Sequence, residues 1–171
     1  MLEIKSITAQ QWPQYEQDVL AIEAMAFSAA QCHPASYYLN ILNSERQVSY
    51  IALVDGKVAG FLFCGPLEMF AQVAGVTDDP HFGQNTVLYD ADIAVNPDFR
   101  NQGIAKKLKQ QQIIDAKTLG YQVIAARNRV KYAHVMWCIN QSLGAVEIQH
   151  LTGIYKDGRE PNACVYNHLV L

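Results

Sequence analysis

The chain has 171 residues, of which 50% are hydrophobic and 17% are charged. This length and composition predict one soluble globular domain over residues 1–171 and exclude an intrinsically disordered chain. Thirteen basic and 16 acidic residues give a net charge of −3, so we expect neither nucleic acid nor an anionic membrane as a partner.

The termini and cysteines suggest a location for the protein. Residues 1–5 lack a basic region followed by a long apolar run, and no later stretch is long enough to cross a membrane. We therefore expect a cytoplasmic protein. Cys32, Cys64, Cys138 and Cys164 form no C-x-x-C pair and have no histidine spacing that suggests zinc. We expect reduced thiols and no metal site.

The first half of the chain predicts a strand, two helices and a hairpin. The strand covers residues 2–8, and a short helix covers residues 36–42. Between them, apolar residues recur at helical spacing, and Pro13 is tolerated because it falls in the first turn. Residues 48–54 and 58–63 read as strands around Asp55-Gly56, a dipeptide favoured in tight hairpin turns. The helically spaced residues are Trp12, Tyr15, Val19, Ile22 and Ala26.

The second half alternates strands and helices. Residues 87–95 and 121–126 read as strands, with a helix over residues 103–119 between them. A final helix carries the apolar stripe Tyr132, Met136, Ile139 and Leu143, and residues 145–155 and 163–170 form a second hairpin. This order predicts the α/β class, with a mixed sheet rather than a run of parallel crossovers.

Two segments leave alternatives open. The connection over residues 68–86 is longer than an ordinary hairpin loop, so it either walls a substrate pocket or runs over the surface. Ile113 and Ile114 fall off the apolar stripe of their helix. A helix of which only one half is covered by the core explains these positions. The alternative is that Ile113 or Ile114 contacts a second subunit in a homodimer.

Residues 95–105 join a strand to a helix through a basic turn that contains a glycine. Gly103 lets a ligand approach the main chain, and the unpaired N–H groups of the first helical turn then point at it. Because these donors and the helix dipole act together on an anion, the segment predicts a phosphate cradle. Helix starts without a ligand are far commoner, so the turn alone does not establish one.

The run Val95, Arg100, Gly103, Ala105 contains an R-x-x-G-x-A pattern that resembles the acetyl-coenzyme A signature of the GNAT acetyltransferase superfamily. The resemblance implies a GNAT-like fold with a central, mostly antiparallel sheet of about six or seven strands flanked by helices. It also implies acetyl-CoA as co-substrate. The resemblance covers most of the chain and includes Ile22, Glu23, Phe27, residues 50–63 and Leu143-Gly144-Ala145.

The resemblance assigns a coenzyme site. It implies that main-chain N–H groups of residues 102–106 bind the pyrophosphate, with Arg100 and Lys106 adding charge. Solvated surface charge is the alternative for both cations. The side chains of Ile93 and Val95 are expected in the core, with their main-chain groups facing the thioester. The expected coenzyme-binding residues are Ile93, Ala94, Val95, Arg100, Asn101, Gln102, Gly103, Ile104, Ala105, Lys106 and Asn140.

Asp90 and Asp92 are the candidate catalytic residues. They lie two apart on a predicted strand, so both carboxylates project from one face. An alkyl amine with a pKa near 10.4 is only about 0.1% neutral near pH 7.4, so its proton must be accepted before it attacks. A carboxylate acting directly or through water performs that task, and Asp92 is similar in position to an acidic residue of polyamine-acetylating relatives. A water-filled strand end or pairing with Lys or Arg is the alternative.

The sequence departs from the family at the usual general acid. Many relatives carry a Tyr at the position of Asn140, and an amide hydrogen-bonds a sulfur but does not protonate it. Tyr132 has suitable chemistry, but we expect it in the core. Buried structural roles are expected for Cys64 and Cys138, with an acyl-enzyme on either thiol as the alternative. Solvated charge is the default for Arg127, Arg129 and Lys131, and the resemblance implies contact with the adenosine 3′-phosphate as the alternative.

These residues predict an N-acetyltransferase in which a primary amine attacks bound acetyl-CoA directly. We expect a small cationic acceptor, such as a polyamine, amino sugar or amino acid derivative. A protein lysine or N-terminal amine is the rival acceptor. An acyl-CoA-binding sensor without catalysis is the alternative from another class, since Asn140 replaces the general acid.

Overall fold

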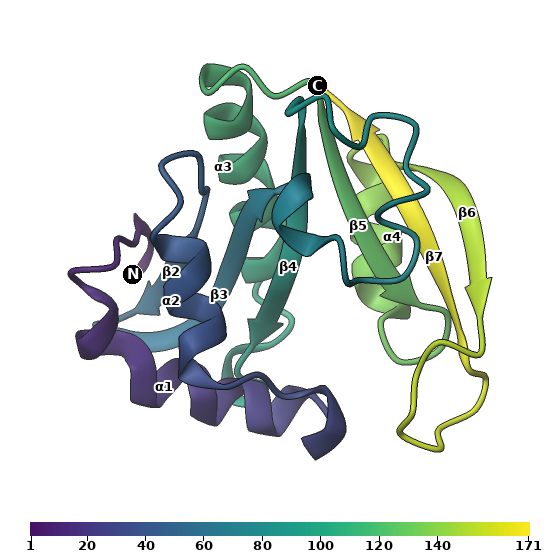
Figure 1. Cartoon of the computed structure of the whole chain (residues 1–171). Helices are drawn as coiled ribbons and strands as arrows, with labels where there is room; N and C mark the ends of the chain where they lie inside the picture. Colours follow the sequence, from purple (N-terminus) through teal and green to yellow (C-terminus); the bar gives the residue numbers. More distant parts are fainter. The chain divides into compact units, whose positions relative to one another are not determined.

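The computed structural model describes residues 1–171, which form two compact units. The first comprises Met1–Gly65 and Ala91–Asp115, and the second comprises Pro66–Asp90 and Ala116–Leu171. The seven strands follow the order β1-β2-β3-β4-β5-β7-β6, and helices accompany them in each unit (Figure 1). The predicted mixed α/β sheet of six or seven strands is therefore confirmed. The expectation of one domain over the whole chain stays a prediction.

The first unit contains the predicted strand, helices and hairpin. β1 (Leu2–Ser6) pairs antiparallel with β2 (Tyr50–Val54), and β2 pairs antiparallel with β3 (Lys57–Pro66). Asp55 and Gly56 between them have φ of +48° and +81°, the conformation that a tight two-residue hairpin turn requires. The other elements are α1 (Trp12–Ala26), η1 (Ala29–Gln31), α2 (Ala35–Leu42), the end of β4 (Val87–Val95), η3 (Pro97–Phe99) and α3 (Ile104–Thr118).

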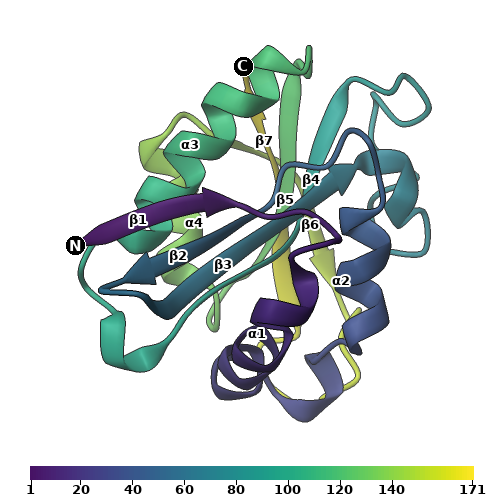
Figure 2. The same ribbon diagram turned by 90° about the vertical axis from the view of Figure 1, so that its left-hand side faces the viewer.

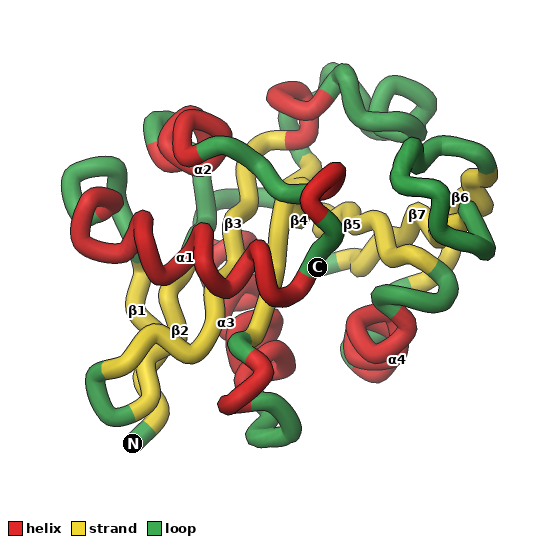
Figure 3. Tube along the Cα trace, turned by 90° about the horizontal axis from the view of Figure 1, so that it is seen from below, coloured by secondary structure: helices red, strands yellow, loops and turns green.

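Helices cover both faces of β2 and β3 in the first unit. On one face, the Phe63 ring lies 5.8 Å from Trp12 of α1 and 4.7 Å from Tyr38 of α2. On the other, the Gln112 amide of α3 donates to the Cys64 sulfur at 2.9 Å. Figures 2 and 3 show α1 and α2 on one side of these strands and α3 on the other. The alternation of side chains along β3 thus builds two apolar layers.

Gly60 sets the distance between β3 and β4. A Cβ added there would lie 2.8 Å from the Ala94 carbonyl oxygen and 3.3 Å from the Val95 Cα. No real side chain tolerates that approach to main chain, so the glycine is required by close packing rather than by its φ. The Asn96 N–H donates to the Ala59 carbonyl at 2.9 Å, which holds the end of β4 in place.

The second unit is built around β7. The start of β4 pairs in parallel with β5 (Val123–Arg129), with Val87 opposite Val123. β5 pairs antiparallel with β7 (Ala163–Val170), which pairs antiparallel with β6 (Val146–Thr152). The remaining elements are η2 (Leu67–Phe70) and α4 (His134–Ser142). No helix is long and apolar enough to cross a membrane.

The long connection over residues 66–86 is anchored by one carboxylate. Asp79 is 6% exposed, and its Oδ2 accepts from the Tyr166 hydroxyl and lies 2.6 Å from His168 Nε2. Its Oδ1 accepts from the His81 N–H at 2.8 Å, while Glu68 accepts from the N–H groups of Gly83 and Asn85. The segment is therefore tied to β7 and is not a plain surface excursion, while its role as a pocket wall stays a prediction.

The final helix is shorter than the apolar stripe suggests. α4 begins at His134, so Tyr132 lies on the preceding turn and is 45% exposed. The expectation that Tyr132 belongs to the core is wrong, because a position outside the helix does not share its apolar face. Asn140, at 2% exposure, is the buried residue of α4.

We expect Asp79→Asn to lower the free energy of unfolding by about 1.5 to 3 kcal/mol, because it removes charge-assisted hydrogen bonds in a buried site. Burial opposes the charge, but the bonds from His168 and Tyr166 outweigh it and hold the pKa of Asp79 below its usual range. The carboxylate therefore stabilises the fold above its ordinary pKa, and the difference shrinks below about pH 4. Urea denaturation at pH 7 and pH 3.5 measures this, with the exposed Asp78→Asn as control. Equal stability of both variants at pH 7 would contradict the anchor.

Candidate functional site

The turn between β4 and α3 lies wholly in the first unit. The Asn96 side chain accepts from the Asp98 N–H at 3.0 Å, which fixes the direction in which the chain leaves the strand. Arg100 is exposed, and its Nε donates to the Val95 carbonyl at 3.3 Å. This bond holds the guanidinium beside the turn instead of letting it extend into solvent.

Two left-handed residues shape the rest of this turn. Asn101 and Gly103 have φ of +62° and +74°. A Cβ at Gly103 would meet no heavy atom within 4 Å, so the main chain there faces open space. Turns that mix right- and left-handed conformations direct successive N–H groups toward a common point, and anions bind in such nests. The two left-handed residues and the open space at Gly103 are compatible with such a site.

The start of α3 adds further donors. Lys107 makes the first bond of the helix, to the Gly103 carbonyl at 3.0 Å, so the N–H groups ahead of it precede the intrahelical ladder. Ile104 is buried and anchors the helix, while Ala105 is partly buried. The side chains of Arg100, Asn101, Gln102 and Lys106 are exposed. The residues predicted to bind phosphate thus form one cationic turn that is rich in N–H donors.

The end of β4 differs from its prediction. Ile93 and Val95 are only partly buried, whereas Ala94 is 6% exposed and Asp92 is 7% exposed. The expected core packing of Ile93 and Val95 is wrong because side chains alternate along a strand, and the buried face here carries Asp92 and Ala94.

Asp92 is held by α2. The Tyr38 hydroxyl, on a side chain with 0% exposure, donates to Asp92 Oδ2 at 2.6 Å. Burial raises the pKa of Asp92 to about 7, against the opposing effect of the Tyr38 hydrogen bond, and the charge of Glu23 raises it further. A carboxyl group with a pKa near neutrality exchanges protons at the pH of the cell, which an ordinary aspartate does not.

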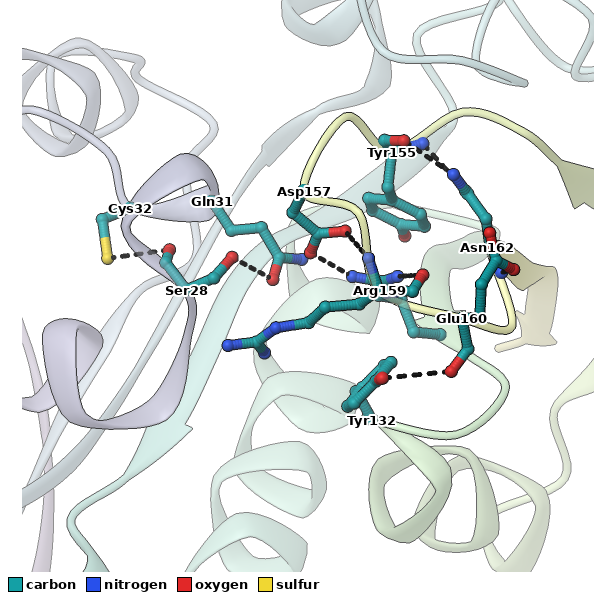
Figure 4. Close-up of polar contacts among 10 residues, drawn as sticks. Ser28, Gln31, Cys32, Tyr132, Tyr155, Asp157, Arg159, Glu160 and Asn162 are labelled. Carbon is teal, nitrogen blue, oxygen red and sulfur yellow. Dashed lines mark hydrogen bonds and ion pairs between the residues drawn. The ribbon is translucent and has the colours of Figure 1, made fainter.

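Glu23 is the second carboxylate of this network. It lies near the end of α1 at 1% exposure, and its Oε1 accepts from the His33 N–H at 2.7 Å. The same oxygen lies 2.8 Å from His33 Nδ1, and the Tyr38 hydroxyl interacts with Glu23 as well as with Asp92. The short turn before His33 is closed by the Cys32 thiol, which donates to the Ser28 carbonyl, and by the Ser28 hydroxyl, which donates to Gln31 (Figure 4).

This network suits a cation or a shared proton. Ligand atoms of Glu23, His33 and Asp92 all lie within 4.8 Å of one another. Two buried carboxylates at such a distance repel each other, and a positive charge or a proton between them relieves the cost. The donors also match those of a metal site, but each of the three side chains already takes part in the hydrogen-bonded network.

Sequence analysis found Asp92 but missed its partners. The available signal was Glu23, because it follows Val19 and Ile22 on the buried stripe of α1, where a carboxylate is unexpected unless it is paired. Tyr38 carried no signal, since it lies 54 residues from Asp92 in the sequence. Asp90 is partly exposed and belongs to the second unit, where its charge adds to the burial that raises the pKa of Tyr89 to about 12.

Asn140 belongs to an amide cluster in the second unit. Its Nδ2 donates to Asn128 Oδ1 at 3.0 Å, and Asn167 Nδ2 donates to the same oxygen at 2.9 Å. Asn140 Oδ1 is buried without a hydrogen-bond partner. Its neighbours thus fix the side chain, and its Oδ1 is left as a buried acceptor without a donor.

Of the three cations before α4, Lys131 is exposed as expected, whereas Arg127 and Arg129 are not solvated. Arg129 is 4% exposed, donates to Asp157 and to the Arg159 carbonyl, and lies 4.1 Å from the Tyr155 ring. Arg127 is partly buried and donates to the Ala74 carbonyl at 3.3 Å. Both take structural roles inside the second unit, where acceptors and rings surround them, although Arg129 Nε is buried without a hydrogen-bond partner.

The β6–β7 connection supplies these partners. Tyr155 and Asn162 bond reciprocally, and the Tyr132 hydroxyl donates to the Glu160 carbonyl at 3.1 Å (Figure 4). The exposed Tyr132 ring is also 5.4 Å from the Arg159 guanidinium. Tyr132 therefore serves the loop rather than the core.

Cys138 also departs from its expectation. It is exposed on α4, with its Sγ 3.5 Å from His134 Nε2, whereas Cys64 and Cys164 are buried. All four cysteines are free thiols, as predicted.

Residues 5–135 match the sequence model of the family described as Acetyltransferase (GNAT) family. No curated protein is similar enough in sequence to count as a relative. The likeness to solved structures extends over the whole chain.

Three of the similar structures illustrate this likeness. A ribosomal-protein-S18-alanine N-acetyltransferase from Escherichia coli has a TM-score of 0.74 at 20% identity, covering 99% of this chain and 94% of its own. A polyamine N-acetyltransferase from Drosophila melanogaster has a TM-score of 0.75 at 16% identity, covering 100% of both chains. An acetyltransferase from Salmonella typhimurium, solved with acetyl-CoA, has a TM-score of 0.73 at 16% identity, with 99% and 94% covered. These likenesses establish the fold.

We expect two substitutions to move the pKa of Asp92 in opposite directions. Tyr38→Phe removes a hydrogen bond that favours the carboxylate, so the pKa rises above about 7. Glu23→Gln removes a neighbouring negative charge, so the pKa falls. NMR titration of ¹³C-labelled aspartate measures both, with Asp98→Asn used to assign an exposed signal. Shifts of the same sign in the two variants would contradict the network.

Proposed function

The chain belongs to the GNAT acetyltransferase family, and we propose that it transfers an acetyl group from acetyl-CoA to a primary amine. The observation that carries this proposal is the buried Asp92, whose pKa of about 7 suits a general base near neutral pH. The turn before α3 supports it from the coenzyme side.

Residues of the turn fit the phosphates of acetyl-CoA. The N–H groups of residues 102–106 are proposed to bind the pyrophosphate, with Arg100 and Lys106 adding charge-assisted contacts. The open space at Gly103 leaves room for an oxygen against the main chain. Main-chain groups of Ile93, Ala94 and Val95 are proposed to orient the pantetheine arm and polarise the thioester carbonyl, a task that needs fixed N–H donors and no special side chain.

Asp92 is proposed to accept the proton of the attacking amine. The bound alkylammonium loses one proton to Asp92 before its nitrogen attacks the thioester carbon, and the nitrogen loses a second proton as that bond forms, which neutralises the departing thiolate. The coenzyme supplies the activated acetyl group and leaves as a thiolate. Asn140 is proposed to hydrogen-bond the sulfur, while Asp90 is proposed to add negative charge for a cationic acceptor.

The charge of the network favours a small cationic acceptor. Glu23 and Asp92 are buried together, and the rings of Tyr37 and His33 stack at 3.9 Å beside them. An alkylammonium supplies the positive charge that this arrangement lacks, and aromatic faces attract such cations.

There are two alternatives to acetylation of a small cationic amine. A protein N-terminal or lysine amine is the rival acceptor, and the Escherichia coli enzyme acts on a ribosomal protein. A non-catalytic acyl-CoA sensor is the rival class, favoured by Asn140 in place of a Tyr.

A thiol-release assay across amines, amino sugars and peptides, run beside calorimetry of coenzyme binding, separates these proposals. Release with small amines supports the proposed function, and release with peptides alone supports the protein acceptor. Tight binding without release under any acceptor supports the sensor, whereas no binding would reject the coenzyme site.

We expect Asp92→Asn to lower kcat by about 10²- to 10⁴-fold and to leave the Kd of acetyl-CoA nearly unchanged, because it removes the general base alone. In the wild type, kcat/KM for the amine falls as the pH drops through 7, since the raised pKa of Asp92 makes the carboxylate protonated below that pH. The variant lacks this inflection. Steady-state kinetics from pH 5.5 to 9 test it, and unchanged turnover would remove Asp92 from the mechanism.

We expect Arg100→Ala to weaken acetyl-CoA binding by about tenfold or more, because a charge-assisted hydrogen bond to phosphate is lost. Lys117→Ala, an exposed cation at the other end of α3, is the matched control and leaves binding unchanged. Calorimetry measures both. Equal affinity in the two variants would mean that Arg100 is a solvated surface charge and does not contribute to acetyl-CoA binding.

A further inference from the structure

A general base at the position of Asp92 must release the proton that it has accepted before the next turnover begins. Its carboxyl is 7% exposed, so bulk water has little direct access to it. Tyr38 has 0% exposure and Glu23 has 1%, whereas the His33 side chain is 34% exposed. The one solvent-facing member of the network is therefore its far end, His33.

The four groups form a continuous series of polar contacts. The Tyr38 hydroxyl lies 2.6 Å from Asp92 Oδ2 and also interacts with Glu23. Glu23 Oε1 lies 2.8 Å from His33 Nδ1. The groups come from β4, α2, α1 and the turn before α2, so the contacts depend on the packing of the first unit.

We propose that Tyr38, Glu23 and His33 relay the substrate proton from Asp92 to solvent; this rests on the proposed function of Asp92. The Asp92 carboxyl passes its proton to the Tyr38 oxygen as the Tyr38 hydroxyl proton moves to Glu23. Glu23 passes its proton to His33 Nδ1, and His33 Nε2 releases one to water. Each group gives one proton for each it receives, so the only net change is transfer of one proton from the amine to solvent.

The chemistry of each member fits its step. Tyr38 stays a neutral phenol, because burial and then the charge of Asp92 raise its pKa far above neutrality, so it conducts by exchanging protons and not by ionising. Cys32 lies near both carboxylates, but burial, Glu23 and Asp92 raise the pKa of its thiol. Cys32 therefore remains protonated and does not provide a second route for the proton from Asp92. His33 is the member of the network that reaches water, and its imidazole has one nitrogen to accept a proton and another to release one.

The decisive variant is His33→Ala, tested with added imidazole. We expect kcat to fall about 10- to 100-fold with the KM of acetyl-CoA unchanged, and imidazole to restore much of the loss in proportion to its free-base concentration. Pyrazole has the same shape but is a far weaker base, so it restores nothing. His150→Ala, an exposed histidine beside Glu147, is the matched control and keeps full activity.

Glu23→Gln separates a relay from a structural role. Glutamine keeps the size and a hydrogen bond to His33 but cannot carry a proton, so its lost activity is not restored by imidazole. We expect the wild type to show a solvent isotope effect on kcat, and we expect both variants to change it. Wild-type turnover in His33→Ala, or equal rescue by imidazole and pyrazole, would overturn the relay.

NMR tests the connection without turnover. Because coupled groups share their titration, the titration of the His33 imidazole is expected to change in Asp92→Asn and not in Asp98→Asn. An unchanged His33 titration would overturn the relay even in an active enzyme. A wild type that is inactive on every amine would instead reject the proposed function, while a changed titration would still support the proton connection.

Discussion

The first unit depends on a hydroxyl group placed between two buried carboxylates. Tyr38 bonds to Asp92 and interacts with Glu23, and its ring packs against Trp12 and Phe63. The same side chain thus fills the apolar layer and satisfies the polar network. Without that hydroxyl, the Asp92 carboxylate would lose its hydrogen bond beside Glu23 in a region that excludes water, and the protonated carboxyl would be favoured. The site is consequently inseparable from the core that surrounds it.

The turn before α3 follows a different design. Its shape comes from local main-chain conformation, with left-handed residues at Asn101 and Gly103, and its donors come from the start of a helix. Few tertiary contacts are needed beyond the burial of Ile104 and the anchoring of Asn96. A local site of this kind tolerates change elsewhere in the chain, whereas the network around Asp92 requires four elements to pack correctly.

The second unit uses buried polar groups to hold loops. Asp79 ties residues 66–86 to β7, Arg129 ties the β6–β7 connection to β5, and Asn128 links Asn140 to Asn167. Each is satisfied by several hydrogen bonds, which is the condition under which burying a polar group stabilises a fold. Composition alone favours solvated charge for such residues, because it counts their types and not their partners.

The sequence by itself determined the elements and the position of the glycine-bearing turn before α3, because hydrophobic period, turn residues and helix starts are local properties. Strand 87–95, the Asp55-Gly56 hairpin and the helix after Gly103 all agree with the structure. The sequence also singled out Asp92 as an unexpected carboxylate. Tertiary structure decided which residues surround it, which face of β4 is buried, and that Tyr132 and Arg129 serve a loop. Those outcomes depend on contacts between residues that are distant in the chain, and no local pattern encodes such contacts.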